Sequence, residues 1–519
     1  MDVSWGVIEM AEVVNIVVRM DSNQVERFAA EELAAYTGAM TGKKINVTSE
    51  ASGKAIYVGF LPDCVPAGEK AQVLNELGAV QQDGYIIRSI GEDLVIKGRT
   101  PRGTLYGVYD YLRMLGVRWY FPGKEHEFVP SRREVILRNV NIARSPDMNH
   151  RSIVIHSGNS ALLDWVDFAA KTKLSAIHLH SDERIREMPD ILASRGLDFG
   201  LRRHFFGGVY PPPDEAEMDR NRSLLLDYIR SLPVQLNDFF LWPADRPLEL
   251  QDDEQERELS LPDAVLMFTN EMLKAIRTLR PDARMSFLVY WSTWKAPETI
   301  RPLDGVFLEL APIFRCFSHA ISDPACPINS KEILPVIGDI LQVFDPAEAH
   351  VLGYWLDASL FGRSRYKALS GRLPQIGSII KQDIKHYKSR GIPNISTFAV
   401  GIDREYLSTY TCPSIFQYPA LLWNVESDLR SQLMDFCENY YGDRGMAEVF
   451  QLDEQTDPND TSVVGWDTLK DRYARAISVA KEILQGSTDD VHIQRLGRLM
   501  RELERMSSWV DNMSKSQSY

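Results

Sequence analysis

The hydrophobic positions of residues 150–425 fall into short apolar runs that alternate with helical or loop stretches. Several runs are almost continuously apolar, as in Phe239–Trp242, which is typical of parallel strands that helices cover on the outside. The eight runs are Ile153–His156, Ala176–His180, Asp198–Phe205, Asp238–Trp242, Met285–Tyr290, Gly305–Leu310, Val351–Leu356 and Ile395–Val400. Eight such strands predict an α/β fold of the (β/α)8 TIM-barrel class, whereas only seven would favour an open sheet.

Different patterns flank this region. The N-terminal part mixes strands and helices, including a helix over Gln24–Tyr36 that we expect to end at Gly38. The C-terminal part carries apolar residues at three- and four-residue spacing over Leu469–Leu484 and Ile493–Met506, which indicates amphipathic helices. The predicted domains are therefore a small α+β unit (1–145), the barrel (146–425) and a helical C-terminal region (426–519).

The charge and the cysteines of the chain limit the classes of partner and of cellular compartment that we expect for it. A net charge of −14 argues against nucleic-acid and anionic-membrane binding, because both partners are polyanions. The sequence has no run of about 18 apolar residues that would span a membrane, and its start, MDVSWGVIEM, lacks the basic segment of a secretory signal. The 5 cysteines form no CxxC pair, which favours reduced thiols in a cytoplasmic protein over a disulfide framework or a zinc ribbon. A homo-oligomer is compatible with all of this.

Acidic and aromatic residues dominate the C-terminal ends of the predicted strands, where barrel enzymes have their active sites. Asp245 follows the fourth strand in a loop that two prolines stiffen. Glu309 lies in the sixth strand, and strand alternation turns it and Phe307 away from the aliphatic side. Because carboxyl pairs cleave glycosides, we predict Asp245 and Glu309 as the catalytic residues; which of the two donates the proton stays open.

Each of these acids also has a purely structural interpretation. Asp245 would then pair with Arg246 in the same loop, as exposed acids often do. Glu309 would form a salt bridge with Arg315 or another cation, because an unpaired buried carboxylate is costly.

Further polar and aromatic residues at the strand ends are suited to bind sugars, since aromatic faces stack on sugar rings and imidazoles bond hydroxyl groups. The predicted substrate-binding residues are His156, His180, His204, Arg203, Tyr290, Trp291, Trp355, Asp357 and Asp403. Arg202 or Arg203 could clamp a substrate carboxylate. A zinc site at His178, His180 and His204 is the alternative for the histidines, but HExxH is absent, and we predict no metal and no other cofactor.

Several segments resemble known carbohydrate enzymes. Those similar to the N-terminal domain of hexosaminidases and α-glucuronidases are Arg27–Leu33, Ala55–Phe60, Arg99–Tyr109 and Gly116–Gly123. Asp245, Glu309–Pro312 and Arg315–His319 resemble a bacterial family, formerly of unknown function, that is allied to the endo-β-N-acetylglucosaminidases of glycoside hydrolase family 163. The resemblance covers about residues 20–440 and implies a glycosidase with acids after the fourth and sixth strands.

The chain departs from these families in one loop. Relatives often have a glycine- and cysteine-rich loop after the position of Asp245, where this chain has Arg246–Glu249. The adjacent Asp-Glu pair of family 20 hexosaminidases is also absent, so substrate-assisted catalysis of that form is not supported. The sequence thus predicts a glycoside hydrolase of oligosaccharides or glycans, with β-N-acetylglucosaminides as candidate substrates. The alternatives are an α-glucuronidase-like enzyme and a non-catalytic glycan-binding barrel.

Overall fold

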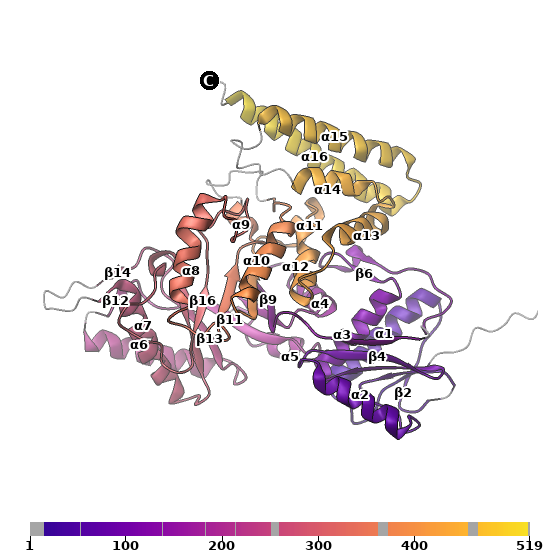
Figure 1. The fold of residues 1–519 in the computed structure, drawn as a ribbon, viewed down its shortest axis with the longest axis horizontal. Coiled ribbons are helices and arrows are strands. Elements are labelled where there is room, and N and C mark those ends of the chain that lie inside the picture. Colours follow the sequence, from indigo (N-terminus) through magenta and orange to yellow (C-terminus); the bar gives the residue numbers. More distant parts are fainter. Residues whose placement is uncertain are drawn as a thin grey trace, which may run out of the picture.

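The computed structural model describes residues 15–51, 53–136, 139–181, 183–212, 214–250, 259–361, 372–454 and 465–516. A six-stranded sheet with helices on both faces comes first, a closed eight-stranded parallel barrel follows, and a group of helices ends the chain (Figure 1). The predicted fold class, a TIM barrel between an α+β unit and a helical region, is confirmed.

The N-terminal sheet has the strand order β2-β1-β3-β5-β4-β8. Its strands are β1 (Asn15–Val17), β2 (Val47–Thr48), β3 (Ala55–Val58), β4 (Tyr85–Ile90), β5 (Asp93–Gly98) and β8 (Asn141–Arg144), and a separate pair is formed by β6 (Arg118–Trp119) and β7 (Glu127–Phe128). Alternate side chains serve opposite faces. One face packs on α1 (Gln24–Thr41) and α3 (Pro101–Met114), and the other, through Val17 and Val95, packs on Val73 of α2 (Ala67–Ala79).

Helix α1 is longer than predicted. It continues through Gly38 to Thr41 and ends at Gly42, whose φ of 68° is the left-handed conformation that a C-terminal glycine adopts. At Gly38 a Cβ atom would lie 3.0 Å from the carbonyl oxygen of Lys43. The absence of a side chain there therefore allows the chain that leaves the helix to pass close by, and the prediction of a helix end at Gly38 was wrong.

The barrel strands run in the order β10-β11-β13-β15-β16-β17-β18-β9, and the pairing of β18 with β9 closes the ring. They are β9 (His150–Ile155), β10 (Ala176–Leu179), β11 (Asp198–His204), β13 (Asp238–Trp242), β15 (Arg284–Val289), β16 (Val306–Leu310), β17 (His350–Gly353) and β18 (Asn394–Phe398). Each overlaps one of the eight predicted apolar runs. The short strands β12 (Val209–Tyr210) and β14 (Glu249–Leu250) pair outside the ring.

Helices surround the barrel and cover the outward-facing side chains. They are α4 (Leu162–Lys171), α5 (Met188–Ala193), α6 (Glu215–Ser231), α7 (Leu261–Arg277), α8 (Leu334–Ile340), α9 (Ala358–Phe361), α10 (Gly377–Ser389), α11 (Arg404–Thr409) and α12 (Ser414–Trp423). A π-helical turn, Asn329–Ile333, precedes α8. Because both faces of the strands are buried, the interior of the ring is a packed core, with access for a ligand only at the strand ends.

Ion pairs join the N-terminal unit to the barrel. Asp83 accepts hydrogen bonds from Arg102 of α3 at 2.8 Å and from Arg151 of β9 at 2.6 Å. Arg102 also reaches Asp198 at the start of β11, over 2.7 Å. Tyr106 of α3 donates to the carbonyl oxygen of Leu174, just before β10. These contacts lie at the beginnings of the strands, so the N-terminal unit covers the barrel face opposite the strand ends that form the mouth.

The C-terminal helices are α13 (Leu429–Tyr441), α14 (Met446–Glu454), α15 (Trp466–Gly486) and α16 (Asp490–Ser516), and α15 and α16 lie side by side at the top of Figure 1. Glu502 of α16 is buried, pairs with Arg372 and accepts a hydrogen bond from the backbone of Thr411 over 3.1 Å. Asp435 of α13 pairs with Arg118 of the N-terminal unit over 2.7 Å. The C-terminal helices thus contact both preceding units.

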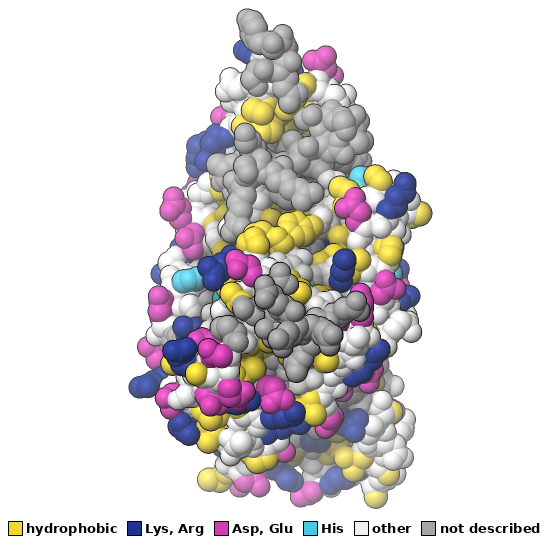
Figure 2. Space-filling model, turned by 90° about the vertical axis from the view of Figure 1, so that its left-hand side faces the viewer, with side chains coloured by type: hydrophobic (Ala, Val, Ile, Leu, Met, Phe, Trp, Pro, Cys, Tyr) yellow, Lys and Arg dark blue, Asp and Glu magenta, His cyan; other side chains and the backbone are white. Residues whose placement is uncertain are grey.

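The surface carries charges of both signs. On the face drawn in Figure 2, acidic and basic side chains are interspersed, and hydrophobic side chains gather around the middle of the face. Among the described residues no helix is long and apolar enough to cross a membrane. The cysteines are free thiols.

Candidate active site

Aromatic and imidazole rings line the barrel at the C-terminal ends of its strands. Trp242, the last residue of β13, has its ring centroid 5.6 Å from that of His180, 5.1 Å from that of His204 and 6.4 Å from that of Phe398. Phe398 in turn lies 5.3 Å from Tyr354, which directly follows β17. Five strands, β10, β11, β13, β17 and β18, or the residues that directly follow them, therefore contribute to one continuous set of rings. We call Trp242, His180, His204, Phe398 and Tyr354 the ring cluster.

The two histidines of the ring cluster have defined tautomers. His180 Nδ1 lies 3.1 Å from the carbonyl oxygen of Arg202, and His204 Nδ1 lies 2.5 Å from that of Pro243. Because a carbonyl oxygen only accepts, Nδ1 carries the proton in both rings, and in the neutral ring Nε2 is an acceptor. Burial lowers the pKa of His180 to about 4, and His204 and His156 contribute in the same direction. His180 is therefore neutral near pH 7.

Asp245 is an exposed carboxylate at the edge of the ring cluster. Its Oδ1 accepts a hydrogen bond from the Tyr290 hydroxyl over 3.2 Å, which joins the loops after β13 and β15. Backbone bonds hold the same loop: Ala244 donates to the Gly207 carbonyl over 3.3 Å, and Leu248 donates to Ser292 Oγ over 3.0 Å. Asp245 is thus a solvent-facing acid on a braced loop.

The alternative partner of Asp245, Arg246, lies elsewhere. Its guanidinium covers Gly208, where a Cβ atom would be only 2.9 Å from the Arg246 Nε. Glycine at this position therefore makes room for the arginine, and the described hydrogen bond of Asp245 is the one with Tyr290.

Glu309 points into the barrel as predicted, but it is sealed there, with 0% of its surface exposed. Its Oε1 accepts from Arg202 Nε over 2.7 Å, and its Oε2 accepts from the indole nitrogen of Trp242 over 2.7 Å. The cation is therefore Arg202, not Arg315, which pairs with Asp383 instead. A carboxylate with both oxygens engaged and no exposed surface has no contact with a substrate, so this geometry does not support the predicted catalytic role of Glu309.

The Arg202–Glu309 pair lies inside the barrel, beneath the ring cluster. Strand register places Arg202 beside Phe240 and His204 beside Trp242, so the pair lies one layer below the rings. Burial raises the pKa of Tyr354, and the acidic groups that raise it further are Tyr290, Asp357, Glu309 and Asp245. Of the acids predicted from the sequence, Asp245, Glu309 and Asp357 therefore lie within electrostatic range of Tyr354.

Trp291 lies on the rim beside this cluster. Its ring is 6.2 Å from that of Tyr290 and 6.2 Å from that of Phe314, and Trp291 and Phe314 are 41% and 42% exposed. The backbone of Trp291 has a φ of 44°, a left-handed conformation that costs a non-glycine residue about 1 kcal/mol or more. The position of Tyr290 and Trp291 agrees with their predicted place at the strand ends.

Two predicted substrate-binding residues face the outside of the barrel. Arg203 lies over the ring of Tyr228 in α6, with 5.1 Å between Cζ and the ring centroid. Trp355 is 1% exposed and donates from its indole nitrogen to Asp383 of α10 over 2.8 Å. The residue that precedes each of them in the sequence faces inward instead: Arg202 before Arg203, and Tyr354 before Trp355. These contacts do not support the substrate-binding roles predicted for Arg203 and Trp355.

The remaining predicted residues lie at the mouth, and each accepts hydrogen bonds from nearby backbone N–H groups. His156 is exposed and its Nδ1 accepts from the Gly158 backbone over 3.2 Å. Asp357 is 7% exposed, and its Oδ1 accepts from the backbone of Ser359 over 2.9 Å and of Leu360 over 3.1 Å. Asp403 caps α11 in the same manner, through a bond from the Tyr406 backbone over 2.9 Å.

Sequence reasoning missed three members of the ring cluster: Trp242, Tyr354 and Phe398. Trp242 and Phe398 end their strands, and Tyr354 directly follows its strand. All three therefore lie at the C-terminal ends of barrel strands, where the active sites of barrel enzymes lie. Their apolar sequence context is that of core residues, and the structure does bury them, with 2–7% of their surface exposed.

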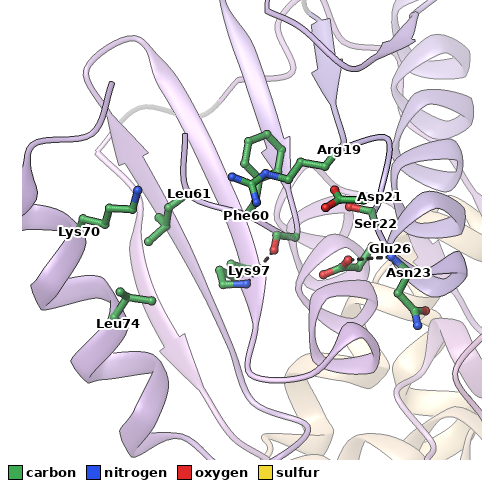
Figure 3. A pocket seen from close by; sticks show the side chains of 11 residues that line it. Arg19, Asp21, Ser22, Asn23, Glu26, Phe60, Leu61, Lys70, Leu74 and Lys97 are labelled. Atoms are coloured by element: carbon green, nitrogen blue, oxygen red, sulfur yellow. Dashed lines mark hydrogen bonds between the residues drawn. The ribbon is translucent and has the colours of Figure 1, made fainter. Parts of the chain in front are cut away.

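A separate pocket of about 370 Å³ lies in the N-terminal unit (Figure 3). It is lined by residues around β1, α1, α2 and β5, and Lys97 there donates to the Gly59 carbonyl over 2.7 Å while Arg19 stacks on Phe60. All its lining residues belong to the N-terminal unit, so it is distinct from the barrel mouth.

Comparisons with known proteins agree with this architecture. Residues 9–111 match the family described as glycosyl hydrolase family 67 N-terminus. A probable α-glucuronidase A from Aspergillus terreus is 29% identical over 87 residues, which are 17% of this chain and 10% of that protein. The chain therefore matches only a tenth of the length of this curated relative.

Two solved structures are similar over most of the chain. One is a family GH115 4-O-methyl-α-glucuronidase with specificity for decorated arabinogalactans, at a TM-score of 0.63 and 10% identity, covering 96% of this chain and 72% of that one. The other is a GH138 enzyme targeting pectin rhamnogalacturonan II, at a TM-score of 0.55 and 11% identity, covering 96% and 69%. These likenesses show the fold alone: a TIM barrel that follows an N-terminal α+β domain.

Proposed function

We propose that the protein is a glycoside hydrolase and that Asp245 is its proton-transferring residue. The observation that carries this proposal is the exposed Asp245 carboxylate, held by Tyr290 at the edge of the ring cluster. A general acid must be within hydrogen-bond reach of the glycosidic oxygen, and Asp245 is the acid of the predicted pair that solvent and substrate can reach.

The ring cluster supplies the means to bind a sugar. Trp242, Tyr354 and Phe398 offer aromatic faces of the kind that pack on the apolar face of a pyranose ring. His180 and His204 present Nε2 as an acceptor for sugar hydroxyl groups, because their Nδ1 protons are engaged with carbonyl oxygens.

Asp357 is the second carboxyl of the proposal. It follows β17, and it shares with Asp245 the electrostatic surroundings of Tyr354. Two backbone N–H groups donate to its Oδ1, which favours the ionised form. An ionised acid suits the nucleophile or base that acts opposite the proton donor, so Asp245 is assigned as the acid and Asp357 as its partner.

Glu309 acts through other groups. It fixes the edge of the Trp242 indole, one of the sugar-binding rings, and it neutralises Arg202, which lies one layer below those rings. Its replacement by Gln should therefore disturb substrate binding and stability together, whereas loss of Asp245 should affect turnover while the fold stays intact.

The substrate class follows from the comparisons and the sequence resemblance together. The family 67 N-terminal match and the α-glucuronidase relative favour a uronic-acid glycoside, while the resemblance to family 163 favours a β-N-acetylglucosaminide. A uronic-acid substrate would need an arginine to bind its carboxylate. Arg202 is paired with Glu309 and Arg203 faces outward, so neither is placed to do this, which weighs against the first class. β-N-Acetylglucosaminides are thus the primary candidates, and glucuronides are the second.

The experiment is a substrate panel of aryl glycosides and oligosaccharides that contains both classes. Wild type should hydrolyse members of one class, and Asp245→Asn and Asp357→Asn should each lose about 10²- to 10⁴-fold in kcat. Asp238→Asn is the matched control. Asp238 begins β13, the strand that Asp245 follows, so it lies at the opposite end of the barrel, where it pairs with Arg284. Glycan binding in calorimetry without any turnover would instead establish a non-catalytic glycan-binding barrel.

A further inference from the structure

Two thiols and an imidazole gather in the loop between β16 and the π-helical turn Asn329–Ile333. The sulfur atoms of Cys316 and Cys326 and a ring nitrogen of His319 all lie within 4.8 Å of one another. The closest described contact, from Cys316 Sγ to His319 Nδ1, is 3.3 Å. Cys326 is buried, whereas Cys316 and His319 are partly exposed, so the cluster is reachable from solvent on one side.

Asn329 holds the backbone around this cluster. Its Oδ1 accepts from the Cys316 backbone over 2.9 Å, and its Nδ2 donates to the carbonyl oxygens of Cys316, His319 and Ala320 over 3.0–3.3 Å. The Asn329 backbone N–H also points at Cys326 Sγ over 3.5 Å. One buried side chain therefore fixes the segments that carry all three groups.

A second anchor ties the loop to the barrel wall. Arg315, directly before Cys316, pairs with the fully buried Asp383 of α10 and donates to the His319 carbonyl over 2.6 Å. Asp383 also accepts from the Ile321 backbone over 2.6 Å. The loop conformation is thus held by groups other than the three candidate ligands, so the ligand set is preorganised.

We propose that Cys316, His319 and Cys326 bind a thiophilic divalent cation of the zinc type. Thiolate and imidazole ligands at about 2.3 and 2.1 Å from a tetrahedral ion are roughly 3.5 Å from each other, close to the 3.3 Å between Cys316 and His319. On binding, both thiols release their protons to solvent, and the two thiolates balance the charge of the ion. Water fills the fourth position.

The site has a consequence for the barrel mouth that rests on the proposed function. Phe314, two residues before Cys316, forms the exposed aromatic pair with Trp291 on the rim. An ion at Cys316 adds to the contacts of Asn329 and Arg315 that already hold this loop, so it further restrains Phe314 in a surface on which sugar units beyond the ring cluster can stack. Loss of the ion should raise KM for long oligosaccharides and leave kcat for small aryl glycosides unchanged.

The test uses the full-length protein and measures bound zinc after exhaustive dialysis. Wild type should retain about one equivalent of Zn²⁺ per chain, and Co²⁺ in its place should give the intense visible absorption of a tetrahedral thiolate complex. Cys316→Ser, Cys326→Ser and His319→Gln should lose most of the metal. The control Cys64→Ser, which removes an exposed thiol elsewhere, should bind as much as wild type.

Two further measurements keep the test decisive if a variant folds poorly. Zinc added to chelator-treated wild type should raise its Tm, and the same addition should leave the Tm of His319→Gln unchanged. The proposal is overturned if wild type retains no zinc, if Cys64→Ser loses it equally, or if intact mass shows a Cys316–Cys326 disulfide instead. None of these readouts requires glycosidase activity, so a failure of the proposed function leaves this test intact.

Discussion

The Tyr290 hydroxyl donates to Asp245 Oδ1 over 3.2 Å, and this contact joins two loops that follow neighbouring barrel strands. It holds an exposed acid beside buried rings, which is the arrangement that proton transfer to a bound sugar requires.

Loss of the Tyr290 hydroxyl should therefore slow the reaction without unfolding the protein. A hydrogen bond between neutral groups contributes about 0.5–1.5 kcal/mol, so Tyr290→Phe should lower kcat/KM by roughly two- to tenfold on the best substrate. The measurement is steady-state kinetics, with thermal unfolding to confirm an unchanged fold. An unaltered rate in Tyr290→Phe would show that the contact does not position Asp245.

The buried pair Arg202–Glu309 should contribute strongly to stability. Glu309→Ala leaves a guanidinium buried without its partner, which should cost about 3–5 kcal/mol of unfolding free energy in urea titrations. Glu348→Ala is the matched control, since Glu348 also pairs with an arginine, Arg284, but is more than half exposed; its loss should cost less than about 1 kcal/mol. Equal costs would contradict the positioning role of Glu309.

The junction between the N-terminal unit and the barrel depends on Asp83. Burial alone would raise the pKa of Asp83, but Arg102 and Arg151 lower it below its ordinary value overall, so the acid is ionised between the buried Arg151 and the partly buried Arg102. Asp83→Ala should destabilise the protein by about 3–5 kcal/mol. Asp198→Ala, which removes the exposed partner of the same Arg102, should cost about 1 kcal/mol or less in the same unfolding assay.

Stability should fall in mild acid because three imidazoles are buried in the barrel. Burial lowers the pKa of His150 to about 3, and it lowers those of His178 and His350 well below 6.5. All three are neutral in the folded state, whereas the unfolded chain binds protons near pH 6.5. Their contribution is therefore complete above pH 6.5 and is lost as the pH falls from 6.5 toward the folded pKa values.

Within that window, each of these histidines should lower the free energy of unfolding by about 1.4 kcal/mol for every pH unit of acidification. Urea titrations between pH 7.5 and 5 measure the slope directly. His350→Phe removes one titrating group and places a ring against Phe240 and Phe307, so its slope should be shallower by about that amount. Identical slopes for variant and wild type would contradict the account of the barrel interior.

The barrel itself was predictable from the sequence, since eight apolar runs map onto the eight paired strands. The inward face of each strand was harder to predict. Arg202 and Arg203 are adjacent, as are Tyr354 and Trp355, and in each pair one residue faces in and the other out. Strands buried on both faces give no polarity signal that would decide between two large neighbours.

The partner of Glu309 was out of reach for a related reason. Nearness along the chain suggested Arg315, but the structure brings Arg202 to it from a strand 107 residues earlier, while Arg315 serves Asp383. Such pairings depend on which strands are neighbours and on their stagger, and the sequence of one chain contains neither. The position of Asp245 in a loop is a simpler matter, because the two prolines beside it are local signals of a loop.

The most direct test of the central claim is the dependence of Asp245→Asn on the leaving group. If Asp245 protonates the glycosidic oxygen, its loss should lower kcat/KM by about 10²-fold or more for an alkyl glycoside and far less for a dinitrophenyl glycoside, whose leaving group needs no proton. The control Asp238→Asn should match wild type on both substrates. An equal loss on both glycosides, or no loss on either, would contradict the assignment of Asp245 as the acid.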